Sequence, residues 1–75
     1  MDIKIKLMGI FKDKTPAGGK IELQDGSTIE DALAALGIPA NSAQVFTVNG
    51  QVERDRRRVL APGAELAVLP PMGGG

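Results

Sequence analysis

The sequence predicts an α+β fold in which a mixed sheet of four to five strands carries one helix on one face. Three patterns in the 75 residues predict it. Apolar residues alternate with lysines near the start, an amphipathic helical stripe follows, and a nearly continuous apolar run precedes the glycine-rich end. A chain of this length holds one domain, near the lower limit for a core that folds unaided.

The first two strands are expected to form a wide hairpin. Apolar residues fall at every second position within residues 2–8, so this segment is predicted to be a strand with one buried face. Residues 11–19 contain proline and paired glycines and are predicted to form the connecting loop. Ile21 and Leu23 alternate again and indicate the return strand.

A single helix is predicted at about residues 29–36. Thr28 and Asp31 have the spacing of a capping box, which places the N-cap at Thr28. Gly37 can take the left-handed conformation that ends a helix, and Pro39 forbids continuation. The stripe expected to pack on the sheet consists of Ile29, Ala32, Leu33 and Leu36.

The second half of the chain supplies the remaining strands. Residues 45–48 are β-branched or aromatic and lead into Asn49-Gly50, a strong hairpin signal, after which residues 51–52 begin a short return strand. Residues 66–69 are continuously apolar, as suits a buried central strand. This order is best satisfied if the first and last strands lie parallel in the middle of the sheet, which is the β-grasp arrangement.

The composition excludes several classes of function. Lysine plus arginine and aspartate plus glutamate number nine each, and 3% of residues are aromatic, which argues against nucleic acid or an anionic membrane as a partner. Cysteine and histidine are absent, which removes disulfides, thiolate chemistry and the commonest metal ligand, so no metal site is expected. The sequence has no long apolar run, so neither a signal peptide nor a membrane span is expected, and a cytoplasmic location is the default.

The candidate reactive group is the carboxylate of Gly75 at the end of the chain. Two prolines stiffen the exit from the last strand, and three glycines remove the side chains, so the end can enter a narrow channel of another enzyme. Such an extended end reaches about 20 Å at most. The predicted division is a domain over residues 1–69 and a flexible tail over residues 70–75. The tail residues expected in the partner's channel are Pro70, Pro71, Met72, Gly73 and Gly74.

A basic stretch precedes the last strand. Residues 53–58 carry both signs of charge with a local excess of arginine, a pattern most often found in a solvated loop. The alternative is a docking patch for an acidic partner, because complementary charge speeds and orients encounter. The residues of this possible patch are Arg54, Arg56, Arg57 and Arg58.

The end of the chain also carries a family resemblance. Small subunits of molybdopterin synthase typically close with Pro-Pro-Val-x-Gly-Gly, and this chain closes with Pro-Pro-Met-Gly-Gly-Gly, with Met72 where valine is usual. The segment Thr-Ile-Glu-Asp-Ala-Leu at residues 28–33 resembles the helix start of that family, and Val-Asn-Gly at residues 48–50 resembles its third-strand exit. Over essentially its whole length the chain resembles the MoaD/ThiS group of ubiquitin-like sulfur carriers. Within this group it is most similar to the molybdopterin synthase small subunit, also called molybdopterin converting factor subunit 1.

The resemblance implies a carrier protein and not an enzyme. In that family a partner related to ubiquitin-activating enzymes uses ATP to convert the terminal carboxylate, here that of Gly75, into an acyl-adenylate, and a sulfur donor then makes the thiocarboxylate. The carrier itself binds no cofactor. The implied acceptor is the large subunit of molybdopterin synthase or a thiazole synthase. The lack of cysteine agrees, because a protein without thiols cannot carry sulfur as a persulfide.

The pathway and the type of product remain open at this point. Pro70-Pro71 favours the molybdenum or tungsten pterin pathway, whereas the triple glycine and short length also resemble carriers for the thiazole of thiamin. A ubiquitin-like modifier would instead join Gly75 to lysines of other proteins through isopeptide bonds. The remaining alternative is an interaction module with an inert tail.

Overall fold

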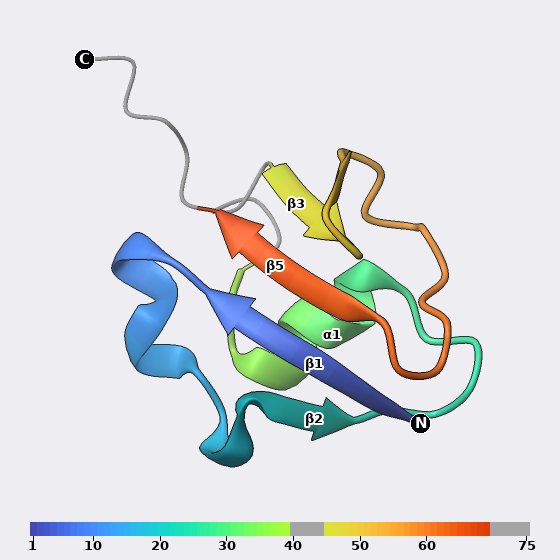
Figure 1. Ribbon diagram of the computed structural model, residues 1–75, viewed down its shortest axis with the longest axis horizontal. Coiled ribbons are helices and arrows are strands. Elements are labelled where there is room, and N and C mark those ends of the chain that lie inside the picture. The colour runs from blue at the N-terminus through green and yellow to red at the C-terminus, as the bar shows by residue number, and fades with distance from the viewer. Residues whose placement is uncertain (40–44, 70–75) are drawn as a thin grey trace.

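A mixed five-stranded sheet carries one helix on one face (Figure 1) in a computed structural model that describes residues 1–39 and 45–69. The strands lie in the order β2-β1-β5-β3-β4. This architecture confirms the predicted α+β class. The bounds are β1 Asp2–Leu7, β2 Lys20–Glu22, α1 Ile29–Leu36, β3 Val45–Val48, β4 Gln51–Glu53 and β5 Glu65–Leu69.

β1 and β5 form a parallel pair at the centre of the sheet. Their register joins Lys4 to Glu65 at one end and Leu7 to Val68 at the other. β2 is antiparallel to β1, β3 is antiparallel to β5, and β4 returns along β3. The predicted contact between the two terminal strands is therefore confirmed, and with it the β-grasp arrangement.

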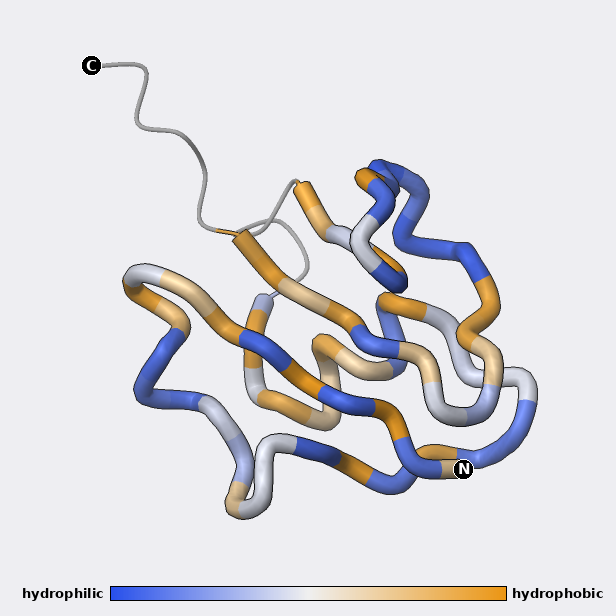
Figure 2. The backbone as a smooth tube through the Cα atoms, viewed as in Figure 1, coloured by the Kyte–Doolittle hydropathy of each residue, from blue (hydrophilic) through white to orange (hydrophobic). Residues whose placement is uncertain are grey.

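The hydrophobic core lies between the sheet and α1. Apolar and charged residues alternate along β1, as the orange and blue of its tube show in Figure 2, so its apolar side chains all reach one face. β5 and β3 add side chains to the same face, and α1 covers it with its apolar stripe. The largest fully buried side chains are Ile3, Ile29, Leu33, Phe46, Leu60, Leu66 and Val68.

Both ends of α1 are those that the sequence predicts. Thr28 Oγ1 accepts a hydrogen bond from the Asp31 N–H (3.2 Å), and the Asp31 carboxylate accepts one from the Thr28 N–H (3.0 Å). At the other end Gly37 has a φ of 74°, and the Ile38 N–H donates to the Leu33 carbonyl (3.0 Å). The predicted helix bounds, N-cap and terminating glycine are confirmed.

The connection between β1 and β2 differs from the expected open loop. It contains two short 3₁₀ helices, η1 (Gly9–Lys14) and η2 (Ala17–Gly19). Phe11 is buried in the core, so hydrophobic burial folds this segment back against the sheet. β1 ends at Leu7, one residue earlier than predicted, because Gly9 turns the chain with a φ of 61°. β2 ends at Glu22, also one residue early.

Of the predicted domain and tail, the structure describes residues of the domain alone. Residues 40–44 and the predicted tail, residues 70–75, lie outside the described residues. The boundary after residue 69 and the flexible tail therefore stay predictions.

Replacing Leu33 by alanine tests the contact between α1 and the sheet. Leu33 is fully buried, so its truncation is expected to cost about 2–5 kcal/mol of unfolding free energy, a large share of the stability of a small domain. Leu36→Ala is the matched control on the same helix, because Leu36 is only partly buried and its truncation should cost clearly less. Urea unfolding followed by circular dichroism measures both losses. Equal losses would contradict this packing of α1.

Candidate functional site

The predicted reactive end follows directly on β5, a central strand of the sheet. The predicted tail residues, which all lie outside the described residues, are Pro70, Pro71, Met72, Gly73, Gly74 and Gly75. The described part ends at Leu69, the last residue of β5 (Figure 1). β5 pairs with β1 on one side and β3 on the other, so the chain leaves the domain from a strand that is held along both edges.

The surface beside this exit is the face of the sheet that α1 does not cover, here called the open face. Residues paired directly across neighbouring strands have side chains on the same face. The pair Lys6↔Ala67 joins β1 to β5, Ala67↔Thr47 joins β5 to β3, and Thr47↔Val52 joins β3 to β4. These pairs set one row of side chains across the open face.

A second row lies on the open face nearer the C-terminal end of β5. Val45 and Leu69 are direct partners in β3 and β5. Met8 follows Leu7, the partner of Val68, and therefore continues the open-face side of β1. The second row thus places apolar side chains where the described chain ends.

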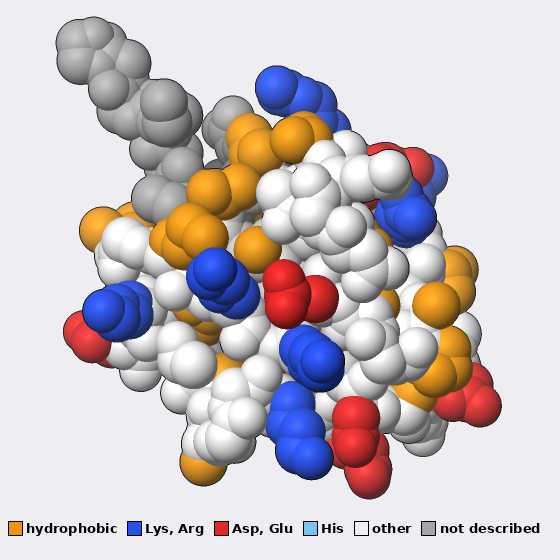
Figure 3. Space-filling model, viewed as in Figure 1, with side chains coloured by type: hydrophobic (Ala, Val, Ile, Leu, Met, Phe, Trp, Pro, Cys, Tyr) orange, Lys and Arg blue, Asp and Glu red, His pale blue; other side chains and the backbone are white. Residues whose placement is uncertain are grey.

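The two rows form a largely apolar surface. Val52 is 62% exposed, whereas Val45 and Leu69 are half-buried. Figure 3 shows hydrophobic side chains gathered at this end of the open face. This surface is called the open-face patch, and its residues are Met8, Val45, Thr47, Val52, Ala67 and Leu69.

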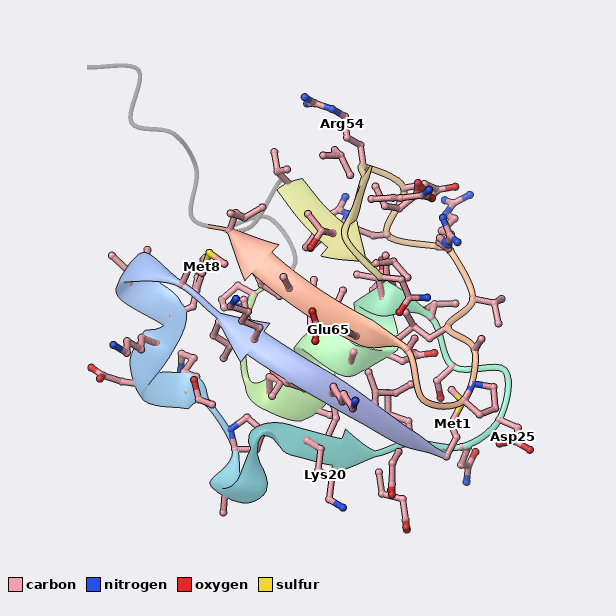
Figure 4. The ribbon with its side chains drawn as sticks, viewed as in Figure 1. Met1, Met8, Lys20, Asp25, Arg54 and Glu65 are labelled. Carbon is pink, nitrogen blue, oxygen red and sulfur yellow. The ribbon has the colours of Figure 1, made fainter. Side chains whose placement is uncertain are left out.

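Charged side chains lie around the open-face patch. Lys6 is exposed and lies beside Ala67 on β1. Arg54 follows the last residue of β4, and its side chain extends outward near the start of β3 (Figure 4). Glu65 lies one row further from the C-terminal end of β5, where it pairs with Lys4. The patch therefore has a cation on each side and a carboxylate along its remaining border.

The turn between β3 and β4 keeps Val52 in register. Asn49 and Gly50 have φ values of 53° and 85°, the left-handed values expected of an Asn-Gly hairpin turn. Asn49 Oδ1 accepts a hydrogen bond from the Glu65 N–H (2.9 Å), and the Asn49 N–H donates to the Glu65 carbonyl (2.8 Å). Asn49 therefore ties the β3–β4 hairpin to the start of β5.

The arginine-rich stretch folds as a loop anchored to the start of α1. The Ile29 N–H donates to the Arg58 carbonyl (3.0 Å), and the Glu30 N–H donates to the Arg56 carbonyl (2.9 Å). These bonds satisfy amides that the first turn of a helix leaves without partners in the helix. The backbone of the loop is thus held by the start of α1.

The four arginines predicted as a possible docking patch do not form one surface. Arg54 lies beside the open face, whereas Arg56 is half-buried and borders a depression next to α1. Arg57 and Arg58 are exposed, and a nitrogen of the Arg58 guanidinium lies 3.9 Å from a Glu53 carboxylate oxygen. Of the four, Arg54 is the one that borders the open-face patch.

Residues 1–39 and 45–69 contain no group of three or more acidic side chains placed to hold a metal ion. The depression beside α1 has a volume of about 660 Å³ and is widely open. Its lining is mainly apolar, with Glu30 and Arg56 as the charged members.

The helix in the described part of the chain is too short to cross a membrane.

The sequence did not predict the open-face patch. The apolar run of residues 66–69 predicts a buried central strand, and its central place is confirmed, but α1 covers only one face of it. Ala67 and Leu69 lie on the other face. The sequence did contain a signal for this patch. Lys4 and Lys6 of β1 lie on the open face, whereas the neighbouring strand β5 carries the apolar residues Ala67 and Leu69 there.

The fold and the placement of the chain's end after a central strand define a ubiquitin-like β-grasp domain. The crystal structure of SAMP1 from Haloferax volcanii matches it with a TM-score of 0.74 at 22% sequence identity, over 100% of both chains. A crystal structure of H. volcanii small archaeal modifier protein 1 matches with a TM-score of 0.73 at 20% identity, over 95% of this chain and 98% of the other. These two likenesses confirm the predicted fold.

The chain belongs to the ThiS family, whose model matches residues 5–75. This match confirms the resemblance to the MoaD/ThiS group. It places the chain among small ubiquitin-like sulfur-carrier proteins. No match to a curated protein reaches significance.

Replacing Asn49 by alanine tests the tie between the hairpin and β5. The change removes the acceptor for the Glu65 N–H and places at positive φ a residue whose side chain cannot hydrogen-bond, so about 1–2 kcal/mol of unfolding free energy should be lost. Asn49→Asp is the control, because aspartate keeps the acceptor oxygen and tolerates this conformation. Thermal and urea unfolding compare the variants. An Asn49→Ala protein as stable as wild type would mean that the hydrogen bond contributes nothing.

Proposed function

We propose that this chain is a sulfur carrier in which the Gly75 carboxylate becomes a thiocarboxylate. The observation that carries the proposal is that a ThiS-family domain is followed, directly after β5, by the sequence Pro-Pro-Met-Gly-Gly-Gly. The chain contains no cysteine, so its side chains cannot carry sulfur as a thiol or persulfide. The C-terminal carboxylate is the group left for this task.

The proposed chemistry takes place in partner enzymes. An oxygen of the Gly75 carboxylate attacks the α-phosphorus of ATP, which forms an acyl-adenylate and releases pyrophosphate. A donor of hydrosulfide then attacks the acyl carbon, AMP leaves, and sulfur takes the place of one oxygen. Activation is needed because a carboxylate alone has no good leaving group. The chain binds no cofactor in this scheme, and ATP belongs to the activating enzyme.

The proposed destination of the sulfur is the pterin of the molybdenum or tungsten cofactor. Pro70 and Pro71 support this pathway, because they match the end of molybdopterin synthase small subunits. In this role the chain acts in the cytoplasm as the small subunit, and the large subunit of that synthase accepts the sulfur. The alternative acceptor is a thiazole synthase of thiamin formation, which the triple glycine supports.

A ubiquitin-like modifier is the second candidate function. The likeness in fold to a structure described as small archaeal modifier protein 1 favours it. Both functions begin with the same adenylate and differ in the nucleophile that takes the acyl group. The nucleophile is a sulfur donor in one case and the amine of a lysine in the other. The product, and not the activation step, therefore distinguishes them.

The carrier function predicts a change at one residue. Incubation with the cognate activating enzyme, ATP and a sulfur donor should add the mass difference of sulfur replacing oxygen, and fragmentation should place it at Gly75. Deleting Gly74 and Gly75 should abolish this change and leave the melting temperature nearly unchanged, because both residues lie outside the predicted domain of residues 1–69. Intact-protein mass spectrometry measures both results.

Two outcomes of this experiment count against the sulfur carrier. If a demonstrably competent activating enzyme produces neither adenylate nor thiocarboxylate on the full chain, the proposed function is wrong. If adducts between Gly75 and lysines of other proteins form instead, the modifier function takes its place.

The enzyme that accepts the sulfur distinguishes the pterin pathway from the thiamin pathway. The thiocarboxylated protein should transfer its sulfur to a pterin precursor in the presence of the large subunit of molybdopterin synthase, and should not support thiazole formation by thiazole synthase. Replacing Pro70 and Pro71 by alanine should lower transfer by the first enzyme, because the prolines stiffen the start of the tail. Single-turnover formation of each sulfur-containing product measures transfer. Turnover by thiazole synthase alone would assign the chain to the thiamin pathway.

A further inference from the structure

We propose that β2, an edge strand of the sheet, pairs antiparallel with β2 of a second copy of this chain and forms a two-fold symmetric dimer. In this pairing Ile21 lies opposite Ile21 of the second copy, and Lys20 lies opposite its Glu22. The sheets of the two copies then form one continuous sheet.

The first observation that carries the proposal is that β2 has a strand on one side alone. The sheet order places β2 at one end, beside β1 (Figure 1). Lys20 and Glu22 are exposed, and Ile21 between them is half-buried. An edge strand carries a row of backbone N–H and C=O groups that can pair with another strand. β2 is therefore a place where the sheet can be continued.

The second observation is the direction of the backbone groups in β2. The Leu23 N–H donates to the Met1 carbonyl (2.9 Å), and the Met1 nitrogen donates to the Leu23 carbonyl (2.7 Å). Bonded and non-bonded pairs alternate along an antiparallel ladder, so Ile21 supplies the next bonded pair with β1. The N–H and C=O groups of Lys20 and Glu22 therefore point away from β1, towards the free side of β2.

These outward groups match those of a second β2 related by a two-fold axis. In a register centred on Ile21, Lys20 of one copy and Glu22 of the other exchange two backbone hydrogen bonds, and the symmetry repeats them at the other end of the strand. Ile21 then forms a non-bonded pair with its counterpart. Side chains come closest in such pairs, so the exposed part of each Ile21 is covered.

The third observation is the pattern of charge at this edge. The register of β1 and β2 places Lys20 opposite Lys4 and Glu22 opposite Asp2, so like charges face each other within one copy. Like charges directly opposite in a sheet are destabilising. A diagonal contact relieves this weakly, because Lys20 Nζ lies 3.9 Å from an Asp2 carboxylate oxygen and both side chains are 60% exposed.

The antiparallel pairing of two copies supplies the missing opposite charges. Lys20 faces Glu22 of the second copy, and the two-fold axis repeats this contact at the other end of the strand. A parallel pairing of the same strands would instead place Lys20 beside Lys20 and Glu22 beside Glu22. The charges therefore favour the antiparallel register in which the outward backbone groups also match.

The other edge of the sheet lacks this complementarity. β4 reads Gln51-Val52-Glu53, so its antiparallel self-pairing would set the neutral Gln51 opposite Glu53. A Glu53 carboxylate oxygen also lies 3.9 Å from the Arg58 guanidinium. Pairing of β2 with β4 of another copy would leave an unused edge at each end and would continue as a fibre, whereas pairing of β2 with β2 closes. It also leaves the end of β5 uncovered, because β1 lies between β5 and β2.

Charge reversal followed by rescue tests the dimer. Lys20→Glu sets carboxylates opposite each other across the two copies, and Glu22→Lys sets ammonium groups opposite each other, so each should raise the dissociation constant of the dimer about tenfold or more. The double variant Lys20→Glu/Glu22→Lys restores opposite charges and should return the constant to within about threefold of wild type. Sedimentation equilibrium over protein concentrations up to about 1 mM measures these constants.

Two controls accompany these variants. Gln51→Lys changes the charge of the β4 edge and should leave the dissociation constant unchanged. Circular dichroism melting should show that the β2 variants are folded, because Lys20 and Glu22 are both exposed.

Isotope-filtered NMR on a mixture of labelled and unlabelled chains checks the register. A contact between Ile21 of one copy and Ile21 of the other is expected, because a non-bonded antiparallel pair brings two Cα atoms to about 4.5 Å. Added salt should weaken the dimer, because salt screens exposed ion pairs.

Three results would overturn the proposal. The first is a chain that stays monomeric up to about 1 mM, which would leave the β2 edge for a strand of another protein. The second is a double variant that associates as weakly as the two single variants. The third is a dimer that Gln51→Lys alters, which would place the contact at β4. None of these results bears on the proposed function, which is tested by the product at Gly75.

Discussion

The parallel pairing of β1 with β5 is the contact on which the rest of the structure depends. It joins the two ends of the fold, with Ile5 beside Leu66 and Leu7 beside Val68 at the centre of the sheet. The other strands add to the outer edges of this pair, and α1 packs on the apolar face that the pair creates. The pairing also fixes where the chain leaves the domain, because β5 ends at Leu69 between two neighbouring strands.

A domain with a single helix covers only one face of its sheet. β1 keeps its half of the open face polar with lysines, which alternate with the core residues and stay in water. β3, β4 and the end of β5 place apolar residues there instead, so that half of the open face is only partly shielded from water. The division of the open face into a charged half and an apolar half follows from the strand order. The apolar half lies where the chain leaves the domain.

Under the proposed function, an apolar surface beside the end of β5 has a physical advantage. Fixing each backbone residue costs about 1–2 kcal/mol of conformational entropy, and glycine loses more than most residues. The three terminal glycines have no side chains whose burial in the channel could offset that loss. Docking of the domain makes entry of the tail an intramolecular step with a high effective concentration. In this scheme the folded domain supplies recognition, the tail supplies the reacting carboxylate, and the partner supplies the catalysts.

The sequence by itself determined the elements that depend on neighbouring residues. The bounds of α1 follow from its apolar stripe with Thr28 and Gly37 at its ends, and the Asn49-Gly50 turn follows from its own two residues. The end of the chain likewise indicated the family directly. Contacts between distant segments decided the rest. Burial of Phe11 folded the expected loop into η1, and backbone hydrogen bonds to the start of α1 fixed the arginine loop. The face on which α1 packs left Ala67 uncovered by the helix, and no local pattern in an apolar run shows which face will be covered.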